Sequence, residues 1–368
     1  MLTPNDPAAA VATLSQVHTK PRPGQAPLHD VSLTVRRGEI FTLLGTGGAA
    51  PSGAATALAL FAGFARASAG QVILGGRQMD ATPPHRRWIG MVSRTPTLFP
   101  HLDVESHARF APGVTSAQAD ALLHRLELSA FARRKPATLP PEIQFRVALA
   151  RALASSPPLL LLESPVVTLP PTASTSIKIM LRALVAETGL AILHATDDAH
   201  SSYGFSDRVG VIQSGALRQV GTPQELYDRP ASLAVAQAMG PVNRLAGTVV
   251  DCEDDIARVR LAGGIIVEGH TAEELHAGEA CVIALRPERI AVAAVQADEM
   301  GFGALPARLL ETVFAGDHTK MRFSLDTRTE HGPELIVSRP SSATAMRSNV
   351  VCLAWQPHHA HAFRTEQA

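Results

Sequence analysis

The sequence predicts an α/β domain with a largely parallel sheet, followed by a smaller domain built mainly of β-strands. In the first two-thirds of the 368 residues, short apolar runs alternate with helical patterns, as in a sheet whose strands are joined by helices. Near Pro241 the pattern changes to short alternating runs separated by glycine-rich turns. We expect a mobile segment over residues 1–12, the first domain over 13–240 and the second over 241–368.

Three buried strands are predicted in the first domain from continuous apolar runs. Residues 40–44 lead into a glycine-rich loop, residues 159–162 are bounded by Pro158 and Pro165, and residues 191–194 form the third run. Strands covered on both faces have such unbroken apolar sequences. These runs therefore predict the centre of the sheet.

The helices and a hairpin of the first domain follow from periodicity and from turn residues. Helical spacing resumes over residues 57–61, and Gly189 is placed to end a longer helix. The residues that define the longer helix are Ile177, Met180, Leu181, Leu184 and Val185. Residues 208–220 are typical of a hairpin that turns at Ser214 and Gly215.

The composition excludes several classes of protein. Basic and acidic residues balance at 33 each, and aromatic residues make up 4%, so neither bulk attraction nor base stacking favours a nucleic-acid partner. Cys252, Cys281 and Cys352 are too widely spaced to indicate a disulfide framework or a zinc site. Cys352 lies in an apolar run and reads as a core residue rather than a nucleophile.

A secretory signal and a membrane span are not expected. The first nineteen residues contain no Lys or Arg, so no charged region precedes an apolar stretch. Residues 40–65 contain no charge, but glycines and Pro51 interrupt the middle of this segment. We therefore expect a soluble protein of a reducing compartment.

Nine segments occur in the order and at about the spacing of one family. They cover residues 43–45, 61–64, 90–92, 98–102, 146–153, 159–162 and 221–227 of the first domain, and residues 243–245 and 285–288 of the second. The chain resembles the ATP-binding subunits of ABC-type importers that carry a C-terminal TOBE domain and serve polyamine, ferric-iron or phosphonate uptake. The resemblance implies a P-loop NTPase-like α/β (ABC ATPase) domain and a small all-β, OB-like TOBE domain.

The phosphate-binding loop of that family departs from its pattern in this chain. Such a loop uses glycines to aim backbone N–H groups at phosphate, a lysine for the terminal phosphates and a hydroxyl for Mg²⁺. The corresponding residues are Gly48, Ser52, Gly53, Ala54, Ala55 and Thr56. Alanines stand where the resemblance places the lysine and the metal-binding hydroxyl. Two interpretations stay open, a weakened phosphate cradle and a structural turn between strand and helix.

The acidic strand end and the signature loop also depart from the pattern. By resemblance, Glu163 stands at a magnesium position and Ser164 at the position of the catalytic glutamate, where a hydroxyl is no base near neutral pH. Ser164 is alternatively a cap for the turn before Pro165. In the signature segment, residues 139–143, two prolines remove backbone donors and Glu142 adds a negative charge near phosphate.

Four smaller positions complete the resemblance. Arg94 replaces the loop glutamine, Pro170 replaces an aspartate, and no aromatic residue for stacking on adenine stands near Lys20. His194, which we place at the end of its strand, matches the switch histidine that contacts the γ-phosphate. In the tail, the histidines of residues 358–361 are interpreted as solvated surface, with a transition-metal site as the alternative.

The resemblance implies ATP and Mg²⁺ as cofactors, and membrane permease subunits as partners. It implies a homodimer, or a heterodimer with another ATP-binding subunit, in the cytoplasm and peripheral on the inner face of the cell membrane. Because the chemical groups named above are replaced, we expect ATP hydrolysis to be weak or absent. Two alternatives stay open, a fully active transport ATPase with unorthodox residues and a non-transport scaffold that senses a ligand.

Overall fold

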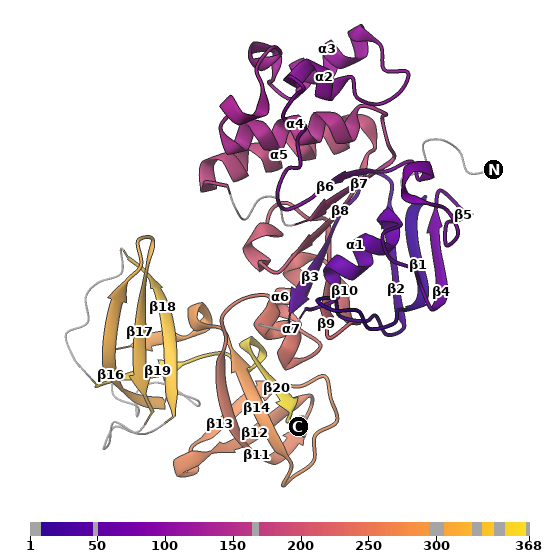
Figure 1. The fold of residues 1–368 in the computed structure, drawn as a ribbon. Helices are drawn as coiled ribbons and strands as arrows, with labels where there is room; N and C mark the ends of the chain where they lie inside the picture. The colour runs from indigo at the N-terminus through magenta and orange to yellow at the C-terminus, as the bar shows by residue number, and fades with distance from the viewer. Residues whose placement is uncertain are drawn as a thin grey trace. The chain divides into compact units, whose positions relative to one another are not determined.

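The computed structural model describes residues 9–46, 51–163, 169–293, 305–325, 333–341 and 350–365. The chain forms two compact units, Met1–Leu226 and Tyr227–Ala368 (Figure 1). The domain limits at residues 12 and 240 stay predictions. Within the described ranges, no helix is both long enough and apolar enough to cross a membrane.

A six-stranded sheet forms the centre of the first unit. Its order is β10-β9-β3-β8-β7-β6, and every neighbouring pair is parallel except β10 with β9. The strands are β3 (Ile40–Thr46), β6 (Gly90–Val92), β7 (Leu159–Glu163), β8 (Ala191–Thr196), β9 (Arg208–Gln213) and β10 (Ala216–Gly221). The three predicted buried strands are confirmed as β3, β7 and β8, and the hairpin as β9 and β10.

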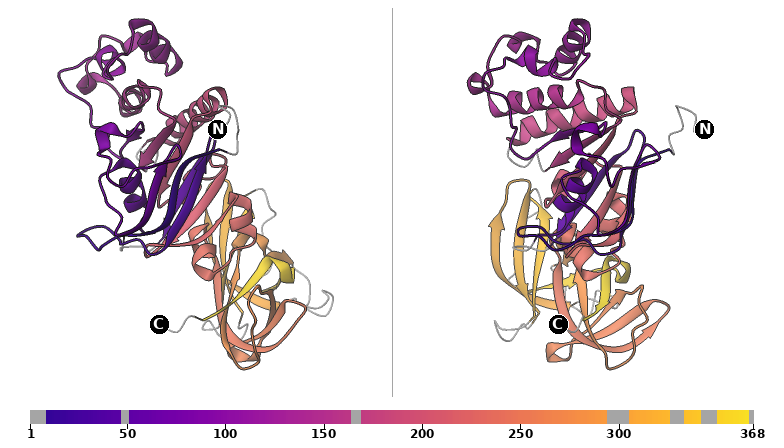
Figure 2. Two further views of the ribbon diagram at one scale, coloured as in Figure 1. Left: turned by 90° about the vertical axis from the view of Figure 1, so that its right-hand side faces the viewer. Right: turned by 45° about the vertical axis from the view of Figure 1, so that its right-hand side comes forward.

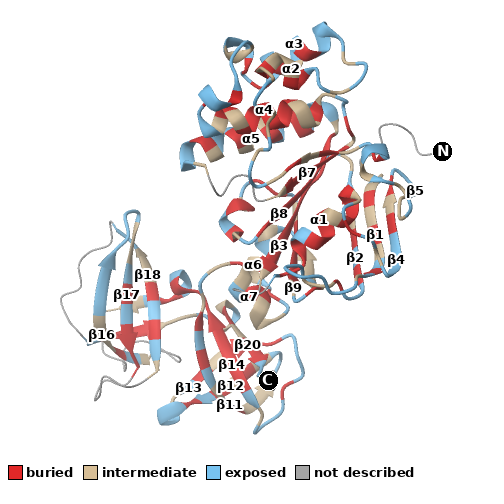
Figure 3. Ribbon diagram, viewed as in Figure 1, coloured by how far each residue is buried: buried red, intermediate tan, exposed pale blue. Residues whose placement is uncertain are grey.

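The unbroken apolar sequence of β7 reflects two cores, one on each face of the sheet. Leu160 and Leu162 belong to one cluster, with residues of helices α4 (Pro141–Leu153) and α5 (Pro171–Thr188). Leu159 and Leu161 belong to the other, with residues of helix α1 (Ala54–Ala62). Successive side chains of a strand point to opposite faces, so both sets must be apolar. In Figure 3 the ribbon of β7 has the colour of buried residues.

A second, antiparallel sheet was not predicted from the sequence. Its order is β2-β1-β4-β5, and the strands are β1 (Ala10–His18), β2 (Val31–Arg36), β4 (Ala69–Leu74) and β5 (Arg77–Gln78). Because β1 begins at Ala10, the end of the segment expected to be mobile over residues 1–12 is part of a strand. Residues 1–8 lie outside the described ranges.

The helices of the first unit follow their sequence signals. Gly189, with φ of 68°, ends α5 as predicted, and Gly63, with φ of 85°, ends α1. Two shorter helices are α2 (Val104–Ala108) and α3 (Ser116–Arg125), and they gather with α4 at one end of the unit in all three views (Figures 1 and 2). The hairpin turns at Ser214 and Gly215, which both have positive φ.

The second unit contains a closed barrel and a five-stranded sheet. The barrel order is β11-β12-β13-β20-β14 and the sheet order is β15-β19-β16-β17-β18. The strands are β11 (Asn243–Glu253), β12 (Ile256–Leu261), β13 (Ile266–His270), β14 (Ala280–Leu285), β15 (Ala291–Ala293), β16 (Leu305–Phe314), β17 (His318–Ser324), β18 (Glu334–Pro340), β19 (Val350–Ala354) and β20 (Ala360–Arg364). This confirms the predicted β-rich domain.

Two short helices precede the barrel along the chain, α6 (Pro223–Asp228) and α7 (Leu233–Ala238). The barrel and the five-stranded sheet share one apolar cluster, which includes Ile283 of β14 and Leu353 of β19. Cys352 is buried, in agreement with its interpretation as a core residue.

Candidate functional site

The carboxyl ends of four parallel strands meet at one edge of the central sheet. Leu44 of β3 lies opposite Thr196 of β8, and Glu163 of β7 lies opposite Ala195. Strand β6 ends beside β7, with Val92 opposite Leu162. In open parallel sheets, ligands bind in the crevice outside these strand ends. The edge is therefore the candidate site.

Helix α1 begins at this edge with an uncapped N-terminus. Gly53 precedes it with φ of 105°, and a Cβ at this position would lie 3.0 Å from the Leu28 side chain, so glycine is required here. No side chain caps the helix, although the Ser52 hydroxyl accepts a hydrogen bond of 3.3 Å from the backbone N–H of Ala54. A helix N-terminus of this kind favours an anion.

The side chains around this helix start have limited chemistry. Ala54 is buried and Ala55 is exposed, and neither carries a charge or a hydroxyl. The Thr56 hydroxyl donates a hydrogen bond of 2.9 Å to the carbonyl oxygen of Ala26, so it is already bonded within the protein. Gly48 lies outside the described residues. The described part of the loop thus offers backbone N–H groups and the Ser52 hydroxyl.

Asp197, which the sequence analysis did not select, lies beside the loop. A Cβ on Gly45 would be 2.2 Å from the Ser52 Oγ and 2.3 Å from an Asp197 carboxylate oxygen, so both side chains flank the same point. Asp197 is exposed and follows β8 directly. The signal was present in the sequence, because two aspartates follow an apolar strand at 197 and 198. This carboxylate adds negative charge at the mouth of the site.

The position of His194 corrects our expectation. His194 is the fourth of six residues in β8 rather than its last, and its side chain is fully buried. Its Nδ1 lies 3.2 Å from the Thr42 hydroxyl, which is 2.5 Å from the Ser206 hydroxyl, and Nε2 has no partner. Burial, and then the charge of Lys178, lower the pKa of His194 to about 3. The imidazole is therefore neutral and shielded from solvent.

The remaining strand-end residues lie where their strands place them. Glu163 is the last residue of β7 and is partly exposed, whereas Ser164 lies outside the described residues. Arg94 is exposed, two residues beyond the end of β6. Along this edge, Glu163 ends β7, Asp197 follows β8, and Arg94 follows β6. Among the described residues, no group of three His, Cys, Asp or Glu is placed to hold a metal ion.

The signature segment forms the start of α4. Pro140 precedes the helix, Pro141 is its first residue, and no side chain caps it. Proline has no N–H, so the first helical position offers no donor. Glu142 lies partly exposed in the first turn, where its carboxylate interacts favourably with the helix dipole and competes with an anionic ligand. At α5, Pro170 stands in the equivalent position before the helix.

A hollow of about 310 Å³ lies beside Lys20 and Thr56. Its cationic residues are Lys20, Arg22 and Arg66, and the described residues that line it include no aromatic ring. An adenine ring in this hollow would therefore have no aromatic surface for stacking.

Comparisons with known proteins match the two parts of this chain. A family model described as ABC transporter matches residues 28–167, and one described as TOBE domain matches residues 283–363. The chain is 34% identical to the spermidine/putrescine import ATP-binding protein PotA of Rubrobacter xylanophilus, over 90% of this chain and 88% of that protein. It is 31% identical to PotA 1 of Pseudomonas aeruginosa, over 94% of each.

The solved structures agree on the fold. The cbiO1 subunit from Clostridium perfringens, part of the ABC transporter complex cbiONQ, gives a TM-score of 0.55 at 23% identity. The match covers 60% of this chain and 91% of that one. A nucleotide-free ATP-binding cassette gives the same TM-score at 19% identity, over 62% of this chain and 98% of that one.

Proposed function

The chain belongs to the ABC transporter ATP-binding proteins with a C-terminal TOBE domain, and we propose that it is the ATP-binding subunit of a spermidine or putrescine importer with weak or absent ATP hydrolysis. The proposed solute is taken from relatives that are named spermidine/putrescine import ATP-binding proteins and that match this chain over almost their whole length. The proposed loss of ATP chemistry is supported by the residues at the strand ends.

The main support is the start of α1, which has no cation and no metal-binding hydroxyl at the expected positions. Ala54 and Ala55 stand at the two positions, and the Thr56 hydroxyl is bonded to a backbone carbonyl. A triphosphate would rely on backbone N–H groups and on the more distant Arg94. The described side chains therefore fit a Mg²⁺–triphosphate poorly.

The charge of Asp197 supports the same conclusion. Its carboxylate and the Ser52 hydroxyl flank one point beside Gly45, where the strand ends meet the helix start. Two unit charges at 4 Å interact by about 1 kcal/mol in water and by about 4 kcal/mol near a protein surface. Because Asp197 is exposed to solvent, a phosphate at this edge would be repelled by an amount near the lower of these two values.

Hydrolysis would also lack its usual groups. Loss of a general base typically slows a reaction by about 10²–10⁴-fold, and loss of a preorganised charge-stabilising donor by about 10²–10³-fold. Ser164 replaces the base by resemblance, and the buried imidazole of His194 does not reach a phosphate in solvent. Either loss alone would make turnover slow.

By family membership, the partners of the subunit are permease subunits. We propose that the chain docks on them in the cytoplasm, at the inner face of the cell membrane, and that two ATP-binding subunits pair head-to-tail. In such a pair, the prolines at the start of α4 would face the partner's nucleotide. The defect would therefore extend to the opposite site.

A titration of the purified chain with Mg²⁺–ATP tests the phosphate loop. We expect weak binding that improves at least about tenfold in the double variant Ala54→Lys, Ala55→Thr, since a charge-assisted bond to phosphate is gained. Ala121→Lys, at an exposed position of α3, is the control for an added charge and should bind like the parent. No gain in the double variant would show that the loop has been placed wrongly.

A second variant tests the carboxylate. Asp197→Asn should tighten Mg²⁺–ATP binding by about three- to tenfold, whereas Asp120→Asn, an exposed aspartate of α3, should not. Rapid Mg²⁺-dependent phosphate release by the unaltered chain would contradict the proposed loss of hydrolysis and favour an active ATPase with unorthodox residues.

A further inference from the structure

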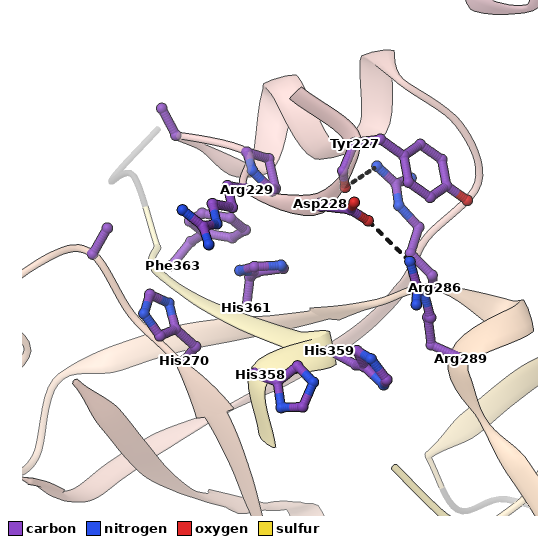
Figure 4. Close-up of a pocket in the computed structure, with 13 residues that line it drawn as sticks. Tyr227, Asp228, Arg229, His270, Arg286, Arg289, His358, His359, His361 and Phe363 are labelled. Carbon is purple, nitrogen blue, oxygen red and sulfur yellow. Dashed lines mark hydrogen bonds and ion pairs between the residues drawn. The ribbon is translucent and has the colours of Figure 1, made fainter. Parts of the chain in front are cut away.

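The second unit contains a hollow of about 740 Å³, and none of the strand-end residues described above lines it (Figure 4). It is bounded by residues 227–231, by the end of β13, by the turn at Pro287–Arg289 and by β20 with the Pro357–His359 turn before it. We call it the histidine–arginine pocket, after His270, His358, His359, His361, Arg229, Arg286 and Arg289. The tail histidines, expected to be solvated surface, thus line a hollow.

The pocket has an excess of positive charge. Its described lining includes three arginines and one carboxylate, Asp228, and Tyr227 of the same lining donates a hydrogen bond to the carboxylate of Glu288. Asp228 accepts a hydrogen bond of 2.9 Å from Arg289. The one carboxylate of the described lining is thus paired with one of the three arginines.

One of these arginines is held rigidly. Arg286 is buried and donates hydrogen bonds of 3.0 and 3.2 Å to the carbonyl oxygens of Gly240 and Pro241. Its guanidinium also stacks on the Tyr227 ring, 4.0 Å from the centroid. A cation fixed in this way contributes its field to the pocket without an ordering cost when a ligand binds.

Two of the imidazoles are shifted mainly by burial and also by neighbouring positive charges. Burial, and then the neighbouring His270, lower the pKa of His361 to about 4, and Arg286 acts in the same direction. Burial, His358 and Arg289 lower the pKa of His359. Asp228 opposes these shifts without overcoming them. Neutral imidazoles keep one N–H donor each and gain a second when a bound anion favours protonation.

The pocket also lies at the seam of the barrel. β13 joins β20 through the parallel pair of His270 with His361, whose rings are 6.1 Å apart. Both side chains lie inside the pocket in Figure 4, together with Phe363, which belongs to β20 like His361. A ligand here would contact the point at which the barrel closes.

These observations restrict the ligand. A polyamine carries the same sign of charge as the lining and would be repelled. A metal centre is not supported, because no three suitable ligands converge among the described residues. A bare oxyanion would leave most of the hollow unfilled, since pockets of roughly 300–1,000 Å³ suit whole organic molecules. The three arginines of the described lining favour an anionic ligand.

We propose that the histidine–arginine pocket binds a phosphate monoester of a small organic molecule. The phosphate bonds to His359, His361 and Arg289, whose guanidinium has several N–H donors and can bind phosphate while one of them stays bonded to Asp228. The organic part lies against Phe363 and the adjacent alanines. Arginine and histidine are well suited to this role, because guanidinium and imidazole N–H groups donate charge-assisted bonds to phosphate oxygens.

The test is a titration of the full chain with phenyl phosphate, followed by NMR of the imidazole signals. We expect saturable binding with shifts of the His361 signal, which is assigned from a His361→Gln variant. Arg289→Gln should weaken binding at least about tenfold. The matched control is Arg258→Gln, because Arg258 forms a similar ion pair of 3.0 Å with Asp251 on the barrel, with similar exposure of both side chains. This control should bind like the parent.

Three results would overturn the proposal. Phenyl phosphate could cause no saturable shift of the His361 signal, or Arg258→Gln could weaken binding as much as Arg289→Gln. Inorganic phosphate could also bind as tightly as phenyl phosphate, which would show that the organic part has no place in the pocket. Spermidine should neither shift the signal nor compete. Because the readout is a histidine of the second unit, it is independent of whether ATP binds to the first.

Discussion

Replacement of His194 by leucine should make the protein less sensitive to acid. In the folded chain the imidazole is fully buried with a pKa of about 3, against an ordinary value of 6.5. Between these values the unfolded chain binds a proton that the folded chain does not bind. The free energy of unfolding therefore falls as the pH falls below 6.5 and does not depend on the protonation of His194 above it.

The magnitude follows from the difference between the two pKa values. Each pH unit below 6.5 costs about 1.4 kcal/mol, so His194 removes about 2 kcal/mol of stability between pH 8 and pH 5. Other histidines, including His107 and His361, also have a lowered pKa and contribute losses of the same sign. The contribution of His194 must therefore be measured as the difference between the parent and the variant.

Urea unfolding at pH 8 and pH 5, followed by far-UV circular dichroism, measures this difference. At pH 8 the stability of His194→Leu should lie within about 1.5 kcal/mol of the parent, because leucine removes a nitrogen that has no partner and leaves Thr42 bonded to Ser206. At pH 5 the variant should keep about 2 kcal/mol that the parent loses.

The control is His124→Gln, because His124 is exposed on α3 and this variant shows what the loss of a histidine outside the core does. The reasoning fails if His194→Leu and the parent lose the same stability between pH 8 and pH 5. That result would mean that the imidazole is protonated in the folded state and is accessible to water. The site would then again have room for a role of His194 beside phosphate.

Two further predictions concern stability and can be measured by urea unfolding at pH 8. Gly215→Ala should cost about 3 kcal/mol or more, because its Cβ would lie 1.7 Å from the Pro27 carbonyl oxygen at φ of 78°. Gly75→Ala should cost about 1 kcal/mol, because no atom lies within 4 Å of the added Cβ and only φ of 53° is unfavourable. Equal costs for the Gly215 and Gly75 variants would contradict the placement of the hairpin beside Pro27. Arg146→Met should lower the free energy of unfolding by about 2–4 kcal/mol, since a buried guanidinium is lost. Glu127→Gln should lower it by less than about 1 kcal/mol, since the Glu127 side chain is 72% exposed. A larger loss for Glu127→Gln than for Arg146→Met would contradict this difference in burial.

The central strands and their helices could be predicted because their signals are local. Residues 159–162 are all leucine, and two cores require this, one for each face of β7. Gly189 ends its helix because only glycine adopts the left-handed backbone conformation there without a steric penalty. The sheet β2-β1-β4-β5 was missed, because its strands mix buried and exposed residues. In addition, β3 of the other sheet and α1 lie between β2 and β4 along the chain.

The candidate site could be predicted only in part. The sequence placed Glu163 and the residues around Gly53 at the strand ends, because the end of an apolar run is visible in the sequence. It placed His194 there wrongly, since β8 continues for two more residues. Asp197, which directly follows the true end of β8, is the side chain that flanks Gly45 together with Ser52.

The sequence by itself determined the fold and family of this protein, since apolar periodicity, glycine turns and ordered motifs are properties of neighbouring residues. Only the tertiary structure decided which side chains share a space. His194 is buried where Thr42 and Ser206 pack together, although Thr42 is 152 residues away from it along the chain. Likewise, Arg286 and His361 line one pocket because the closed barrel pairs β14 with β20, which are far apart along the chain. The entropy lost when such distant strands come together depends on the length of chain between them, which a local pattern does not show.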